Sequence, residues 1–134
     1  MTQIKYYISR LGEIFAAIVS YIFFHEVGHF LFATALGLDP AFVVTEQSGI
    51  AGFTMAAIGV SAGSTTLIAH VFSILGATLL PLMVAISMFA YGLKTENNTF
   101  VNIAEVYLIL IMINLIPFRG LEGSDGNMLW KVFS

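Results

Sequence analysis

The chain has 134 residues, of which 58% are hydrophobic and only 10% are charged, and its mean hydropathy is +0.92. A soluble domain usually carries about a quarter charged residues, so this composition indicates a multi-pass integral membrane protein. The net charge of -3 gives no reason to expect nucleic-acid binding, and the absence of cysteine excludes thiolate metal ligands and cysteine nucleophiles.

Three apolar segments are candidates for membrane-spanning helices. The first covers residues 14–36, which as a helix extend about 34 Å and span a hydrocarbon core of about 30 Å. The second covers residues 67–93 and contains Gly76 and Pro81, which membrane helices tolerate when neighbouring groups satisfy the freed backbone. The third covers residues 100–116 and ends before a proline.

The middle of the first segment contains His25, Glu26 and His29. Two imidazoles and a carboxylate are costly in hydrocarbon unless a partner compensates them. On a helix, His25 and His29 are one turn apart and share a face. This spacing is typical of two ligands of one zinc ion, with Glu26 placed as general base. We therefore expect a zinc site within this segment.

The region between the first two segments, residues 37–66, differs in composition from the rest. It contains five glycines, the acidic residues Asp39 and Glu46, and a β-branched and aromatic stretch at residues 42–45. This pattern predicts short strands and turns at the membrane surface or in a protected cavity. The predicted fold is a mainly α membrane protein with three transmembrane helices and a short membrane-associated β region between the first two, in a single integral domain over residues 1–134.

A catalytic zinc usually takes three protein ligands and leaves the fourth position to water. Four side chains are candidates for the third ligand: His70, Glu105, Glu122 and Asp125. The depth of Glu105 disfavours it, and an interfacial or packing carboxylate is the alternative interpretation. His70 enters the second segment from the side of the glycine-rich region, and its alternative is a buried histidine with a hydrogen-bond partner. The two candidates after the third segment reach the metal if the chain bends inward, and their alternative is a solvated turn.

A second motif, Asn114-Leu115-Ile116-Pro117, closes the third segment and is followed by an acidic residue and a glycine. H-E-x-x-H alone also occurs in soluble helices. Its position inside a first membrane helix, followed two segments later by this second motif, resembles the site-2 protease family of intramembrane zinc metalloproteases. The resemblance covers residues 20–130, nearly the whole chain.

This resemblance implies roles for individual residues. His25, His29 and an aspartate are expected to bind zinc. Glu26 is expected to be the general base, and Asn114 to hold the substrate or to donate a hydrogen bond to the developing oxyanion. The glycine-rich region would correspond to the family's membrane-embedded strands, which pair with an unwound substrate by strand addition.

The chain departs from the family pattern at the acidic residue. The family usually has Leu-Asp-Gly with the aspartate eight positions after the asparagine, and Glu122 holds that position here. An aspartate–glycine pair, Asp125-Gly126, follows three positions later. We predict Asp125 as the third ligand, because the acidic residue, the glycine and a following apolar residue are kept there. Glu122 is the alternative, since a longer carboxylate arm also binds zinc.

Three functions fit this pattern, and the expected partners are the lipid bilayer and either a transmembrane protein substrate or partner subunits of a membrane complex. The first is a zinc metalloprotease that hydrolyses peptide bonds of membrane-spanning substrates, with Glu26 activating a zinc-bound water. The second is a catalytically inactive site-2-protease-like subunit with a structural or assembly role, favoured by the displaced acidic motif and disfavoured by Glu26, because a structural zinc needs no base. The third is a metal or proton transporter, disfavoured by the lack of inverted repeats in the sequence.

Overall fold

The computed structural model describes residues 2–37, 45–46, 53–54, 67–117, 125–126 and 129–130. Three helices make up most of this part of the chain: α1 (Thr2–Ala35), α2 (Leu67–Thr95) and α3 (Asn98–Leu115). All three are long and apolar enough to cross a membrane, which confirms the three apolar helices predicted from the sequence.

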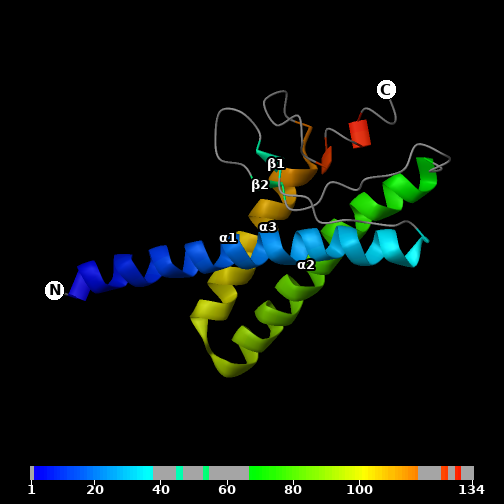
Figure 1. Ribbon diagram of the computed structural model, residues 1–134. Coiled ribbons are helices and arrows are strands. Elements are labelled where there is room, and N and C mark those ends of the chain that lie inside the picture. The colour runs from blue at the N-terminus through cyan, green and yellow to red at the C-terminus, as the bar shows by residue number, and fades with distance from the viewer. Residues whose placement is uncertain are drawn as a thin grey trace.

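The first helix begins at Thr2, well before its predicted start at residue 14. Gly12 lies inside this extension, but a glycine costs a helix only about 1 kcal/mol relative to alanine and does not end it. With 34 residues, α1 extends about 51 Å and is longer than a hydrocarbon core of about 30 Å. Its amino-terminal part projects beyond the other two helices (Figure 1).

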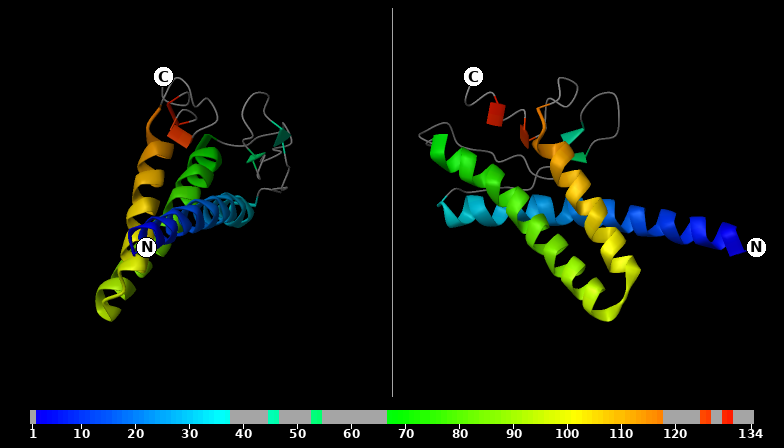
Figure 2. Two further views of the ribbon diagram at one scale, coloured as in Figure 1. Left: turned by 90° about the vertical axis from the view of Figure 1, so that its left-hand side faces the viewer. Right: turned by 180° about the vertical axis from the view of Figure 1, so that it is seen from behind.

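The second and third helices form an antiparallel hairpin, and α1 crosses this hairpin obliquely (Figure 2). The connection is short because Glu96 has a positive φ of 54° and Asn97 caps α3, its side chain accepting a hydrogen bond from the Thr99 backbone N–H at 3.1 Å. The polar residues that separate the apolar segments therefore form a tight turn at one end of the hairpin.

The closest approach of α1 to α2 is made by glycine. A Cβ on Gly28 would lie 2.7 Å from both the Ala77 Cα and the Gly76 carbonyl oxygen, so only glycine allows this contact. On the α2 side, Phe32 packs over Gly76 and occupies the space of its missing side chain. Small residues let membrane helices pack backbone to backbone. The crossing places the His25–His29 turn of α1 directly against α2.

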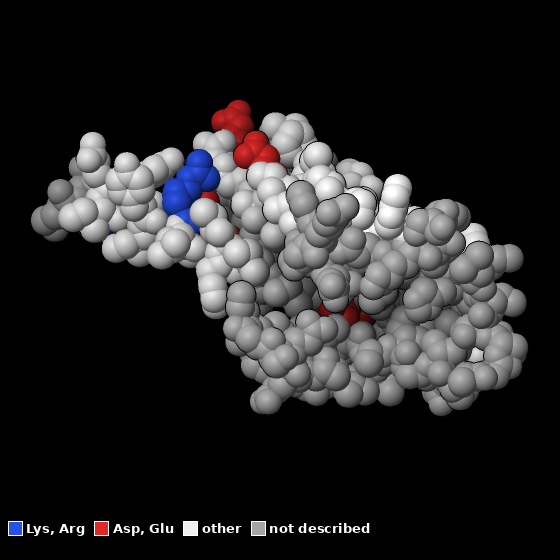
Figure 3. Space-filling model, turned by 90° about the horizontal axis from the view of Figure 1, so that it is seen from above, with Lys and Arg blue, Asp and Glu red and all other residues white. Residues whose placement is uncertain are grey.

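Aromatic and small residues from all three helices form the core: Ala17, Tyr21, Ala85, Tyr107 and Ile111. Outside the core, large apolar side chains on every helix are exposed. The described surface seen from above carries few charged side chains (Figure 3). This distribution is consistent with a helical bundle whose outer surface faces lipid rather than water.

A polar cluster at the hairpin turn joins α1 to the start of α3. Glu13 accepts hydrogen bonds from the Thr99 hydroxyl at 3.0 Å, from the Asn102 side-chain amide at 3.2 Å and from the Arg10 guanidinium at 3.2 Å. Side chains on α3 and α1 thus satisfy the partly buried Glu13 carboxylate. The cluster holds the two helices together at the end of α3 where that helix begins.

Two short strands lie between α1 and α2. β1 (Thr45–Glu46) pairs antiparallel with β2 (Phe53–Thr54), with Thr45 opposite Thr54. Two residues in each strand do not establish the predicted membrane-associated β region, and most of residues 37–66 lies outside the described residues.

Candidate metal centre

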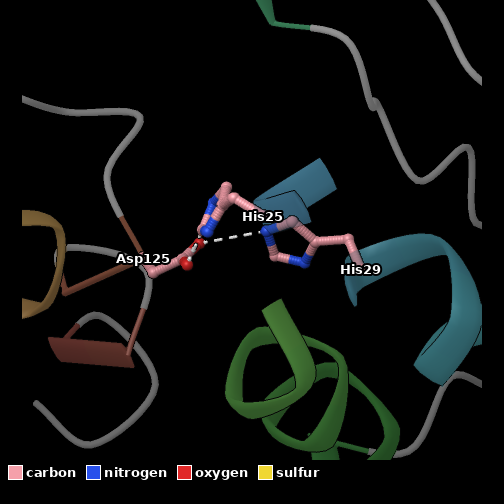
Figure 4. A group of neighbouring side chains, drawn as sticks. All are labelled: His25, His29 and Asp125. Carbon is pink, nitrogen blue, oxygen red and sulfur yellow. Dashed lines mark ion pairs between the residues drawn. The ribbon is translucent and has the colours of Figure 1, made fainter. Parts of the chain in front are cut away.

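Three residues from the two ends of the chain come together beside the α1–α2 crossing. His25 and His29 lie on α1, and Asp125 lies in the segment after α3. The His25 Nε2 is 3.4 Å from the Asp125 Oδ2, and the His29 Nε2 is 3.4 Å from the Asp125 Oδ1. One ligand atom from each residue lies within 4.8 Å of the other two. Figure 4 shows both imidazole rings reaching toward the carboxylate.

The helix explains the arrangement of the two rings. Residues one turn apart project from the same face of α1, and the ring centroids of His25 and His29 are 4.9 Å apart at an interplanar angle of 83°. Both rings direct Nε2 toward Asp125, while both Nδ1 atoms are buried on the far side without a hydrogen-bond partner in the described part of the chain. The pair thus presents two nitrogen atoms to one point.

Asp125 is held against the end of α3 by two contacts. The Asn114 side-chain amide donates a hydrogen bond of 2.8 Å to the Asp125 Oδ2. The next residue, Gly126, lies against the backbone carbonyl of Leu115 so closely that a Cβ would not fit. These contacts place a carboxylate that is only 3% exposed beside the histidines. They also give a physical reason for the aspartate–glycine pair, since a larger residue at 126 would displace its neighbour.

Two of the separations in the cluster suit zinc ligands. Two ligands about 2.0–2.2 Å from a zinc ion, at the tetrahedral angle, are about 3.4 Å apart. Each histidine Nε2 lies at this distance from one oxygen of Asp125, His25 from Oδ2 and His29 from Oδ1, and the three ligand atoms together lie within 4.8 Å of one another. A direct hydrogen bond between charged groups is shorter, about 2.7–2.9 Å. Two imidazole nitrogens and one carboxylate oxygen are a typical donor set for zinc, so the residues present suit the ion.

Glu26 follows the first histidine and is not one of the three clustered residues. Its Oε2 is buried and has no hydrogen-bond partner among the described groups, and the carboxylate interacts electrostatically with His29 and Asp125. A free carboxylate oxygen next to the cluster is what a general base requires.

Tyr21 is a residue of the site that the sequence analysis did not identify. Its ring stacks on His25, with centroids 5.6 Å apart and an interplanar angle of 20°, and the edge of Tyr107 packs against it. Tyr21 precedes His25 by one helical turn, so its position on the same face was available as a signal. The two tyrosines restrict the orientation of the His25 ring.

The sequence analysis also proposed other residues for the site. Glu122 lies outside the described residues, and at His70 the structure describes the backbone alone. Glu105 is exposed on α3 and does not belong to the cluster. Asn114 was predicted to hold the substrate or the oxyanion, and its contact with Asp125 was not foreseen.

Comparisons of the chain with protein-family models, curated proteins and solved structures found no match.

Proposed function

We propose that this protein is an intramembrane zinc metalloprotease similar to the site-2 protease family. The observation that carries the proposal is the convergence of His25, His29 and Asp125, whose ligand atoms lie within 4.8 Å of one another. The Glu26 Oε2 beside them, which has no hydrogen-bond partner among the described residues, supports a catalytic rather than a purely structural site, because a structural zinc needs no base.

The position of the site indicates the class of substrate. Both histidines lie within α1, a helix long and apolar enough to cross a membrane. A cluster at that depth meets polypeptide that is itself in the bilayer, so we propose that the substrate is a membrane-spanning segment of another protein. A helical peptide bond is shielded by its own hydrogen bonds, and cleavage therefore requires local unwinding of the substrate.

The residues of the site have separate roles in the proposed reaction. His25, His29 and Asp125 would hold the zinc ion, which when bound polarises a carbonyl group and lowers the pKa of a coordinated water. Glu26 accepts the proton from the attacking water and delivers it to the leaving amine. Asn114 holds the Asp125 carboxylate through its hydrogen bond.

The test separates an active protease from an inactive subunit that keeps the metal. Wild type, Glu26→Gln and Glu105→Gln are purified in detergent, analysed for zinc, and assayed in liposomes for cleavage of reporter proteins with different membrane-spanning segments. We expect about one zinc per chain in all three. Cleavage is expected for wild type and for Glu105→Gln, whose side chain is exposed and outside the cluster, and not for Glu26→Gln.

Two results would contradict the proposal. Wild-type protein without zinc, purified in the absence of chelators, would remove the metal site. Cleavage by Glu26→Gln at the wild-type rate would show that Glu26 is not the base. Zinc binding by every variant, without cleavage of any reporter by wild type, would instead support the inactive-subunit function.

A further inference from the structure

Both histidines of the site have a buried Nδ1 atom that requires a hydrogen-bond partner. Each Nε2 is directed toward Asp125, so the proton of a neutral, metal-binding imidazole has to be on Nδ1. A buried N–H without an acceptor costs about 1–3 kcal/mol. Metal-binding histidines almost always donate this N–H to a carboxylate, a backbone carbonyl or a water. Neither Nδ1 has a hydrogen-bond partner within the described structure.

The second helix brings a backbone group to one of these nitrogens. Gly28 lies against the backbone of Gly76 and Ala77, and His25 is three residues before Gly28 on the same face of α1. Ala77 is also the residue whose backbone interacts with the His25 ring. Since Nε2 is directed toward Asp125, the atom that can turn to Ala77 is Nδ1. The contact does not reach hydrogen-bond geometry, because Nδ1 has no such partner.

Pro81 explains why the Ala77 carbonyl is available. In an α-helix the carbonyl of residue 77 accepts a hydrogen bond from the N–H of residue 81. Residue 81 is a proline, which has no N–H, and it lies fully buried inside α2. The Ala77 carbonyl thus loses its usual helical donor, and a buried carbonyl requires another. The His25 Nδ1, which has no partner in the described structure, is therefore near a backbone whose carbonyl has lost its helical donor.

We propose that Pro81 is a positioning residue for the metal site: it frees the Ala77 carbonyl to accept the Nδ1–H of His25, which leaves Nε2 for the metal. Gly28 permits the approach and Tyr21 keeps the ring in line by stacking on it. The role in metal binding rests on the proposed function, whereas the hydrogen bond itself does not require a metal. Pro81 serves His25 alone, so the Nδ1 atoms of His25 and His29 are predicted to differ.

The experiment uses the full-length protein in lipid bilayers with ¹⁵N-labelled histidine and ¹³C-carbonyl-labelled alanine. In metal-free wild type, solid-state NMR is expected to show a dipolar coupling from the His25 Nδ1 to the Ala77 carbonyl. Pro81→Ala restores the helical N–H. It is expected to abolish this coupling at His25 while leaving the His29 resonances unchanged.

Zinc affinity provides the second measurement. Pro81→Ala is expected to weaken zinc binding about 10–100-fold, the usual effect of losing a partner of a metal ligand. Leu79→Ala, an exposed position on the same helix, is the control and is expected to leave the affinity unchanged. Absence of this coupling in metal-free wild type would overturn the proposal even if Pro81→Ala failed to fold. Unchanged zinc affinity in a folded Pro81→Ala would also overturn it, whereas wild type that binds no zinc but shows the coupling would refute only the proposed function.

Discussion

The hydrogen bond between Asn114 and Asp125 gives the sharpest quantitative prediction. Asn114→Ala removes the 2.8 Å bond to the Oδ2 of a carboxylate that is 3% exposed. A hydrogen bond to a charged group contributes about 1.5–3 kcal/mol, and about 1.4 kcal/mol corresponds to a tenfold change in a dissociation constant. We therefore expect zinc affinity to fall about 10- to 100-fold, which is also the usual range for partners of metal ligands.

The assay is competition for zinc with a chromogenic chelator, using purified protein in detergent micelles. Asn102→Ala is a matched control: it removes the same side chain from the same helix, where Asn102 donates a 3.2 Å hydrogen bond to Glu13 instead. Because Glu13 lies in the cluster at the start of α3 and Asn114 lies near its end, the control is expected to leave zinc affinity unchanged.

Zinc affinity in Asn114→Ala within twofold of wild type would refute the positioning of Asp125 by this amide. The oxyanion role implied by the family resemblance predicts that result, with normal zinc binding and a lower kcat. A loss of affinity equal to that of Asn102→Ala would also count against positioning, since it would show a general effect of weakening α3.

Two further predictions concern the packing that supports the site. Gly28→Ala places a methyl group 2.7 Å from backbone atoms of α2, so the helices must separate, and we expect lower zinc affinity and a thermal midpoint lowered by overpacking of about 1–3 kcal/mol. Gly12→Ala on the same helix meets open space and is expected to leave both unchanged or to raise the midpoint slightly. Glu13→Ala removes two hydrogen bonds between α1 and α3 and one within α1, and it is expected to lower the thermal midpoint without changing zinc affinity. An equal loss of thermal midpoint in Glu105→Ala, which removes an exposed carboxylate on α3, would contradict this prediction.

Hydropathy and motif spacing predict the parts of this protein that depend on the local chain. The three helices follow from long apolar segments, and the shared face of His25 and His29 follows from the helical period. The predicted start of the first helix at residue 14 was wrong, because it followed the beginning of the apolar segment, whereas a helix continues through more polar residues when nothing breaks it. A change in hydropathy therefore predicts where a membrane-spanning segment begins, and it does not predict where the helix begins.

The sequence did not predict the contacts between segments that are distant along the chain. Neither the Gly28–Ala77 approach nor the Asn114–Asp125 hydrogen bond leaves a periodic signal, because each depends on which helix faces meet. Asp125 was predicted as a ligand only from the aspartate–glycine motif, and this motif did not show which contacts position the residue. In the structure, Gly126 packs against the Leu115 carbonyl, and this contact explains why a glycine follows Asp125.

The ligands of the proposed metal site are carried by two parts of the chain that meet beside the α1–α2 crossing. His25 and His29 belong to α1, Asp125 is docked on the end of α3, and α2 packs against the histidine turn through Gly28. A metal that binds all three ligands therefore binds the assembled bundle and not its separated parts. Its binding free energy adds to the stability of the fold, and the added stability grows with the logarithm of zinc concentration above the dissociation constant. The segment after α3 would gain more from such a metal than a helix would, because its described residues are held at the site by contacts of Asp125 with Asn114 and the two histidines and by the packing of Gly126 on Leu115.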